Sequence, residues 1–424
     1  MPRRTGLIIL LSLVLATAAA CSRDGAGRAA APATPSTAGH HAATATTTAA
    51  SPPVQAQFEQ LLGRHALIAV RLMRGVVSTA PDFERAVSGS MQENTDALSQ
   101  LVASAYGDAQ GDSFKALWQR HLAGLVSYAD AVAGGDEAAK KSAGDALMAG
   151  CGAYGSWLAG ATRGRMPAGD ATGEMRRHVE DLTTQLDAYA AHDYDQAYRI
   201  EREAYEHMFM AGAALAKTSV PPAEARRLNS PPEQLRSAFA MLMGEHMELV
   251  IGAQRATFAR SPEFDAAAGQ INANTAAMTK AMGAIVGPAK AAEFQSGWAG
   301  HIEALVAYAA AAAAGDEAAK AAAVKRLDAV ALGLAKYLSG IVQNRLRVGL
   351  LTGAITEHDR HLLEQVDAYA AKDYATAQRI EADGYQQMRG VADTLVDAIQ
   401  ATVKPGLPVG GSQTGGGGTA RHRH

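Results

Sequence analysis

Apolar residues recur every three or four positions through most of the chain between residues 54 and 402, which is the spacing of amphipathic helices. The clearest case is the segment 114–128, where Phe114, Trp118, His121 and Leu125 fall on one face of the predicted helix. This face is apolar apart from the histidine. The pattern therefore predicts a helix that turns His121 inward, among core residues.

The chain contains a tandem repeat, which appears when the sequence is compared with itself. Trp118 aligns with Trp298 and His121 with His301 at a shift of 180 residues, and His65 aligns with His246 at a shift of 181. Proline-containing segments around residues 219–232 mark a boundary between the two copies. The sequence thus predicts two homologous domains, at residues 53–220 (copy one) and 231–403 (copy two).

Each copy is predicted to hold about six helical segments. In copy one these cover residues 54–77, 81–106, 112–133, 136–161, 174–191 and 193–217. Gly135 breaks the third segment, Asp136 caps the fourth, and Asp193 with Gln196 has the spacing of a capping box. Short connections favour antiparallel neighbours, so we expect an up-and-down helical bundle in each copy.

Composition supports an all-α fold and narrows the function. Alanine is abundant, aromatic residues make up only 5% of the chain, and β-branched runs are scarce, which favours helices over sheets. The formal charge is −3, and removal of Arg3 and Arg4 with a leader lowers it to −5. We therefore expect no nucleic-acid partner, because phosphate backbones attract basic surfaces.

The N-terminus has the pattern of an export signal. Two arginines precede a short apolar run and a small-residue cleavage site at residues 1–21, ending in Cys21. This resembles the lipid-modified cysteine of bacterial lipoproteins, although Ala18 stands where that class usually has a bulky aliphatic residue. The expected location is a cell membrane or outer membrane, on the periplasmic or cell-surface side. An ordinary secreted protein with a coincidental cysteine is the alternative.

Two further segments have compositions that cannot form a core. Residues 22–52 are rich in Ala, Thr and Pro and are predicted to be a disordered tether, and residues 404–424 form a Gly- and His-containing tail. Once Cys21 is acylated, Cys151 has no disulfide partner within the chain. We expect Cys151 to pack as a small apolar residue.

Several polar side chains share helical stripes with core residues and are the candidate site residues. In copy one they are His65, His121, His178, Asn94, Gln185, Glu201 and Met208, and in copy two His246, His301, His358, Asn274, Gln365, Glu381 and Met388. Imidazoles from different helices are the usual way in which a bundle builds a metal site, and histidine with methionine suits copper. A non-covalent haem with His and Met ligands is a further alternative.

Buried hydrogen-bond networks are the more common reason for inward polar groups, and this interpretation stays open beside the metal site. Methionines near His246, and those of residues 207–210, are interpreted as fillers of core gaps. No motif of a known catalytic class appears, so no enzymatic activity is predicted.

The Trp-x-x-His segment, the Asn94-Thr95 pair, His246 after a glutamate and the Tyr-Glu-His-Met run that ends at Met208 together resemble a family of exported bacterial helical proteins. Some of its members carry the label copper amine oxidase in name only. The resemblance implies a helical, surface-exposed module with copper as a candidate ligand. A true copper amine oxidase needs an Asn-Tyr pair, which this chain lacks. The expected function is a binding module, either for a metal or, without metal, for a protein or envelope component.

Overall fold

The computed structural model describes residues 53–78 and 80–402. Within these ranges the chain forms thirteen α-helices and no strand, which confirms the all-α prediction. The predicted export signal with Cys21, the tether and the C-terminal tail lie outside the described residues. None of the described helices is long and apolar enough to cross a membrane.

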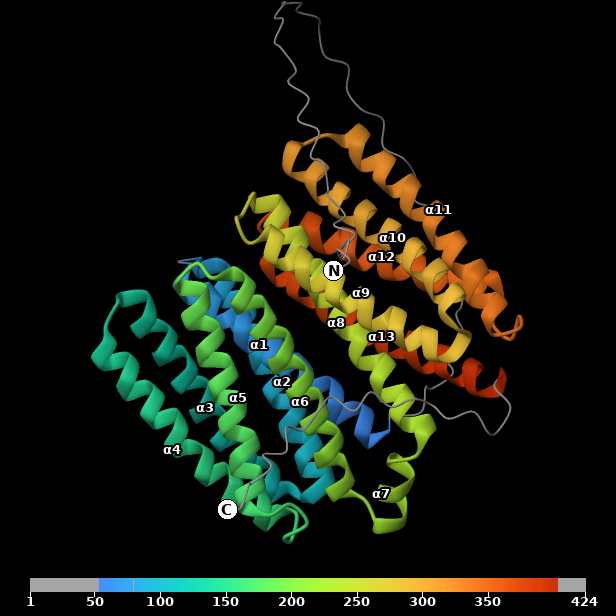
Figure 1. Cartoon of the computed structure of the whole chain (residues 1–424). Coiled ribbons are helices and arrows are strands. Elements are labelled where there is room, and N and C mark those ends of the chain that lie inside the picture. The colour runs from blue at the N-terminus through green and yellow to red at the C-terminus, as the bar shows by residue number, and fades with distance from the viewer. Residues whose placement is uncertain (1–52, 79, 403–424) are drawn as a thin grey trace, which may run out of the picture. The chain divides into compact units, whose positions relative to one another are not determined.

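The two copies have six helices each, and one short helix connects them (Figure 1). Copy one, drawn from blue to green, comprises α1 (Val54–Val77), α2 (Pro81–Tyr106), α3 (Asp108–Gly134), α4 (Glu137–Ala161), α5 (Ala168–Ala190) and α6 (Tyr194–Ser219). The connecting helix is α7 (Pro222–Leu228). Copy two, drawn from yellow to red, comprises α8 (Pro231–Ala259), α9 (Phe264–Val286), α10 (Pro288–Ala314), α11 (Glu317–Ile341), α12 (Val348–Ala370) and α13 (Tyr374–Thr402). Consecutive helices within each copy pack against one another, as the repeat predicted.

The predicted helix ends are mostly confirmed, with three corrections. Helix α3 begins at Asp108, earlier than predicted, and α5 begins at Ala168 rather than at 174. Pro167 precedes α5 in an extended conformation, and Asp170 lies in its first turn, where a carboxylate favours the positive helix end. These two features outweigh the glycines that suggested a loop. The boundary segment holds α7, which was not predicted; Pro222 occupies its first turn.

The turn between the third and fourth helices is the same in both copies. Gly135 has φ 66° and Gly315 has φ 67°, in the left-handed region that favours glycine. The Asp136 side chain then accepts hydrogen bonds from the backbone N–H groups of Ala138 and Ala139, and the Asp316 side chain caps α11 by accepting from the N–H of Ala319. The predicted glycine break and aspartate cap are therefore confirmed.

The core of each copy is built around the aromatic residues of its third helix. Phe114 and Trp118 are each 1% exposed and stack with ring centroids 4.9 Å apart. Phe294 and Trp298 repeat this stacking at 5.2 Å. Burial of one such side chain contributes roughly 1.5–3 kcal/mol. Cys151 is also buried, and its thiol donates to the backbone carbonyl of Leu147 at 3.3 Å, which confirms its structural role.

The two copies contact each other through equivalent residues. The hydroxyls of Tyr205 and Tyr385, which the repeat aligns, lie 3.2 Å apart in the buried interface. Glycine is required opposite them, because a Cβ at Gly63 or Gly244 would lie 2.9 Å or 2.7 Å from atoms of Tyr205. Helix α2 packs on α13 and, equivalently, α9 packs on α6. This exchange of equivalent contacts is the signature of a two-fold relation between the copies.

Buried ion pairs also join the copies. Arg389 of copy two binds Glu59 of copy one at 2.8 Å, and Arg71 of copy one binds two glutamates of copy two, Glu248 and Glu381. Removing one partner of such a pair leaves a buried charge unpaired. Arrangements of the two bundles that separate these partners are therefore destabilised. The described residues of both copies accordingly belong to one compact unit.

Candidate metal centres

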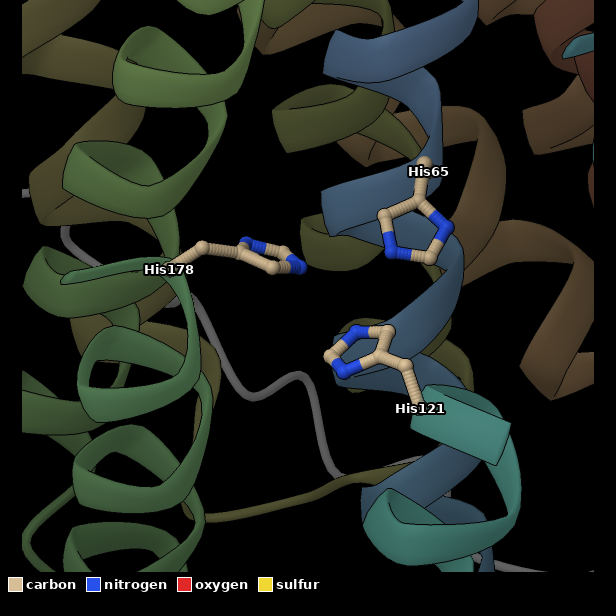
Figure 2. A group of neighbouring side chains, drawn as sticks. All are labelled: His65, His121 and His178. Atoms are coloured by element: carbon tan, nitrogen blue, oxygen red, sulfur yellow. The ribbon is translucent and has the colours of Figure 1, made fainter. Parts of the chain in front are cut away.

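Three histidines of copy one meet at a single point inside the bundle. His65 on α1, His121 on α3 and His178 on α5 turn their rings toward one another (Figure 2). The ring centroids are 5.8 Å apart for His65 and His121, 5.3 Å for His65 and His178, and 5.2 Å for His121 and His178. One nitrogen from each ring lies within 4.8 Å of the other two. We call this group triad one.

Copy two repeats the arrangement with His246 on α8, His301 on α10 and His358 on α12. The corresponding centroid distances are 5.7, 5.5 and 5.5 Å, and one nitrogen from each ring again lies within 4.8 Å of the other two. We call this group triad two. The six histidines predicted as site residues thus form two separate clusters of three, one in each bundle.

A tryptophan ring packs against each triad, and we call this ring the aromatic wall of the triad. The Trp118 ring lies 4.6 Å from that of His65, and the Trp298 ring lies 4.6 Å from that of His246. His65, His178 and His246 are fully buried. The triads therefore lie in an apolar environment, in which imidazoles have few polar partners.

Eleven of the twelve ring nitrogens of the two triads are buried without a hydrogen-bond partner among the described residues. Both nitrogens of His65, His178, His246, His301 and His358, and the Nε2 of His121, are buried without such a partner. A buried polar group without a partner costs about 1–3 kcal/mol. Hydrogen bonds among the described residues therefore do not account for the inward position of these histidines.

Burial keeps the imidazoles neutral. It lowers the pKa of His121 to about 3 and that of His301 to about 4. The pKa values of His65, His178, His246 and His358 are also lowered, by burial first and then by the neighbouring histidines. A neutral imidazole has a free lone pair, which is the form that binds metals.

The triads are close to, and slightly wider than, a formed coordination sphere. Three imidazole nitrogens bound to a zinc-sized ion at 2.0–2.1 Å are roughly 3.5 Å from one another. The observed nitrogens lie within 4.8 Å of one another. The geometry of both clusters therefore fits a first-row transition metal held by three helices.

The predicted asparagines serve the helix packing instead. Asn94 on α2 donates to the backbone carbonyl of Leu61 on α1 at 3.0 Å. Asn274 donates to the carbonyl of Leu242 at 3.0 Å and to the Glu245 carboxylate at 2.6 Å. Each asparagine thus fastens the second helix of its copy to the first. Neither belongs to a triad.

The predicted glutamine and glutamate of copy one surround a buried arginine. Arg74 donates from Nε to Gln185 at 3.1 Å and from Nη1 to Glu201 at 2.8 Å, and its guanidinium lies over the rings of Tyr189 and Tyr198. This group is separate from the triad, because two residues on the same face of a helix can lie at different positions along its axis. His178 and Gln185 are seven residues apart on α5, which is roughly 10 Å along a helix axis.

Copy two repeats this second site around Arg255. The guanidinium binds Glu381 at 2.8 Å, and the Gln365 amide, oriented with its oxygen toward Arg255, accepts at 3.0 Å. The sequence prediction that these residues join the histidines is therefore wrong for Gln185, Glu201, Gln365 and Glu381. Arg74 and Arg255 were missed, although the shift of 181 residues that pairs His65 with His246 also pairs them.

The two predicted methionines are buried in the core of their copies. Met208 is 5% exposed and Met388 is 2% exposed. Met208 also lines a cavity that reaches Trp118, the aromatic wall of triad one. Among the described residues, no contact joins either methionine to the nitrogens of a triad.

One carboxylate near triad two was not predicted. Asp359 Oδ1 lies 3.3 Å from His301 Nδ1, and Asp359 is 4% exposed. Burial, followed by the nearby Asp328, raises the Asp359 pKa to about 8. In copy one the aligned residue is Val179, which is fully buried. The signal in the sequence was that Asp359 directly follows His358 and aligns with an apolar residue, Val179, in copy one.

The chain was compared with protein-family models, curated proteins and solved structures, and none of them matches it.

Proposed function

We propose that the protein binds two transition-metal ions, one in each helical bundle, through the histidines of triads one and two. The observation that carries this proposal is that buried imidazoles converge in threes without hydrogen-bond partners among the described residues. Six polar rings left unpaired in a core lower stability. Their occurrence at matching places in both copies is accounted for by a ligand that uses their lone pairs.

Copper is the ion that this donor set favours. Imidazole nitrogens bind zinc, copper, iron and nickel, and among divalent first-row ions a given site binds copper most tightly. The apolar walls around Trp118 and Trp298 limit the number of water ligands. A site of low coordination number, with three nitrogen ligands, suits copper and zinc better than ions that require six ligands.

The geometry offers no support for the haem alternative. A haem iron takes axial ligands on opposite faces of a flat ring, so the ligands must leave a wide slot between them. In both triads three imidazoles face one point, with ring centroids 5.2–5.8 Å apart. A metal ion without a macrocycle fits this spacing.

The place of action that we propose is the cell envelope. The pattern of residues 1–21, with Cys21 after the cleavage site, supports export and a lipid anchor. Residues 22–52 would then connect the anchor to the helical unit. A module of this kind would hold copper outside the cytoplasm, by binding it and not by chemical conversion.

The test is the metal content of the purified chain after exposure to copper and removal of excess ion. We expect two ions per chain in the parent and none in the double variant His178→Leu, His358→Leu. Leucine fills a similar volume without polar atoms, so the variant should fold at least as stably as the metal-free parent.

The matched control is His192→Lys. His192 is exposed and lies outside the triads, and the residue that aligns with it in copy two is Lys372. This control should keep both ions. Equal copper content in the parent and in the double variant would exclude the triads as the binding sites.

A further inference from the structure

A cleft of about 480 Å³ opens into copy one beside triad one. Four methionines line it, namely Met166, Met175, Met208 and Met210, together with His207. Met210 is 57% exposed, whereas Met175 and Met208 are buried. The thioethers therefore extend from the surface into the core. Met210 does not fill a core gap, contrary to the prediction for this segment.

The cleft reaches the wall of triad one. Trp118 lines the inner end of the cleft, and the same ring lies 4.6 Å from His65 and 5.3 Å from His121. A second cavity of about 260 Å³ is lined by Trp118, Met175 and His121. The two cavities share three lining residues, Trp118, Tyr154 and Met175, so the methionine-lined cleft lies next to a cavity that a ligand of the triad lines.

His207 supplies a nitrogen donor in this cleft. Its side chain is 4% exposed, Nε2 lies 2.7 Å from a carboxylate oxygen of Glu174, and Nδ1 lies 3.5 Å from Asp181. Nδ1 has no hydrogen-bond partner among the described residues. A hydrogen bond from Nε2 to Glu174 would leave Nδ1 with its lone pair, as in many metal-binding histidines.

Copy two shows that packing does not require these side chains. The residues that align with Met166, Met175, His207 and Met210 are, in order, Leu346, Ile355, Gln387 and Gly390. Met208 alone keeps its methionine, as Met388. The same helices thus pack without the sulfur atoms, and the set of thioethers with a histidine is particular to copy one.

We propose that this cleft is a binding site for a soft monovalent ion, Cu(I), held by methionine thioethers and His207, and that it loads triad one. Thioether sulfur selects Cu(I) over hard and divalent ions. The loading role rests on the proposed function of the triads, whereas ion binding in the cleft does not. No electron transfer is part of the proposal, because the ion enters the cleft and leaves it as Cu(I).

The experiment uses Ag(I), a redox-inactive ion with the ligand preferences of Cu(I), and the whole chain. A converted variant takes the residues of copy two: Met166→Leu, Met175→Ile, His207→Gln and Met210→Gly. X-ray absorption at the silver edge should detect sulfur ligands in the parent and lose them in the converted variant. The two cysteines and the other methionines are the same in both proteins, so the difference between their sulfur signals reports the cleft. Sulfur ligation of equal strength in both proteins would overturn the proposal.

A second arm separates the cleft from the triads. Zinc binding at equilibrium should be the same in the parent and the converted variant, and circular dichroism should show equal helix content. If neither protein binds zinc or copper at the triads while the sulfur signal still depends on the cleft, the cleft site stands and the proposed function fails.

Loading is measured in a His358→Leu background, where only triad one remains. The converted variant should fill triad one with Cu(I) more slowly than the parent does. Equal rates would refute the loading role.

Discussion

The two copies contain the same three histidines and differ in what surrounds them. His121 of triad one is 8% exposed and lines a cavity, whereas its counterpart His301 is 1% exposed and lies beside Asp359. Copy one has Val179 at the position of that carboxylate. The same three histidine positions therefore lie in two environments, one beside a cavity and one beside a buried carboxyl group. If the triads bind metal as proposed, triad one is suited to exchange of the ion and triad two to its retention.

The physical reason is the carboxylate. A ligating histidine that donates its other N–H to a carboxylate becomes more basic and is held in one orientation. Asp359 is placed for this role, at 3.3 Å from His301 Nδ1, and has no basic partner among the ion pairs of the described residues apart from that histidine. Burial raises the pKa of Asp359 to about 8, and a metal ion at triad two would favour the ionised carboxylate, whereas triad one has Val179 at this position.

The largest expected difference concerns the arginine sites. Arg74→Met should lower the free energy of unfolding by about 3–5 kcal/mol, because it leaves Glu201 buried without its ion pair. Arg255→Met should cost less, since Glu381 still has Arg71 as a partner. Urea unfolding of the two variants gives the comparison. Equal losses would mean that Arg71 does not support Glu381 in this way.

The next difference concerns metal affinity. Asp359→Val gives triad two the residue of triad one and should weaken metal binding there by about 10–100-fold. The affinity of triad one should stay unchanged in the same chain. Competition with a chelator, in a background where His178→Leu removes triad one, isolates the effect. Should the affinity of triad two be unaltered, the contact between Asp359 and His301 has no role in holding the ion.

The smallest expected difference appears in acid. Buried neutral histidines take up protons only on unfolding, so their contribution to the free energy of unfolding of the metal-free chain should fall as the pH drops below about 6.5, the pKa of an exposed histidine. The loss attributable to His301 should end near pH 4 and that attributable to His121 near pH 3, where the folded groups begin to bind protons.

Denaturant unfolding between pH 7 and pH 3.5 measures this dependence. In the double variant His121→Leu, His301→Leu the slope should be smaller than in the parent. A slope as steep as that of the parent would assign acid sensitivity to other groups.

The sequence predicted the helices and the inward histidines well because both depend on local periodicity. The stripe through Trp118 and His121 is enough to orient one helix face. The sequence could not tell that His178 meets His121 while Gln185, on the same stripe, meets Arg74 instead. That distinction depends on where along their axes helices from distant parts of the chain meet. The periodicity of one helix does not contain this information. The role of Asp359 was hidden for the same reason.

X-ray absorption at the copper edge shows directly whether the histidine triads hold copper. In the chain loaded with two copper ions, we expect a coordination sphere dominated by three imidazoles, with the outer-shell scattering that their rings produce. The His178→Leu, His358→Leu variant, treated identically, should lose this signal. A sphere of water and carboxylate oxygens with fewer than two imidazoles per copper would contradict the account.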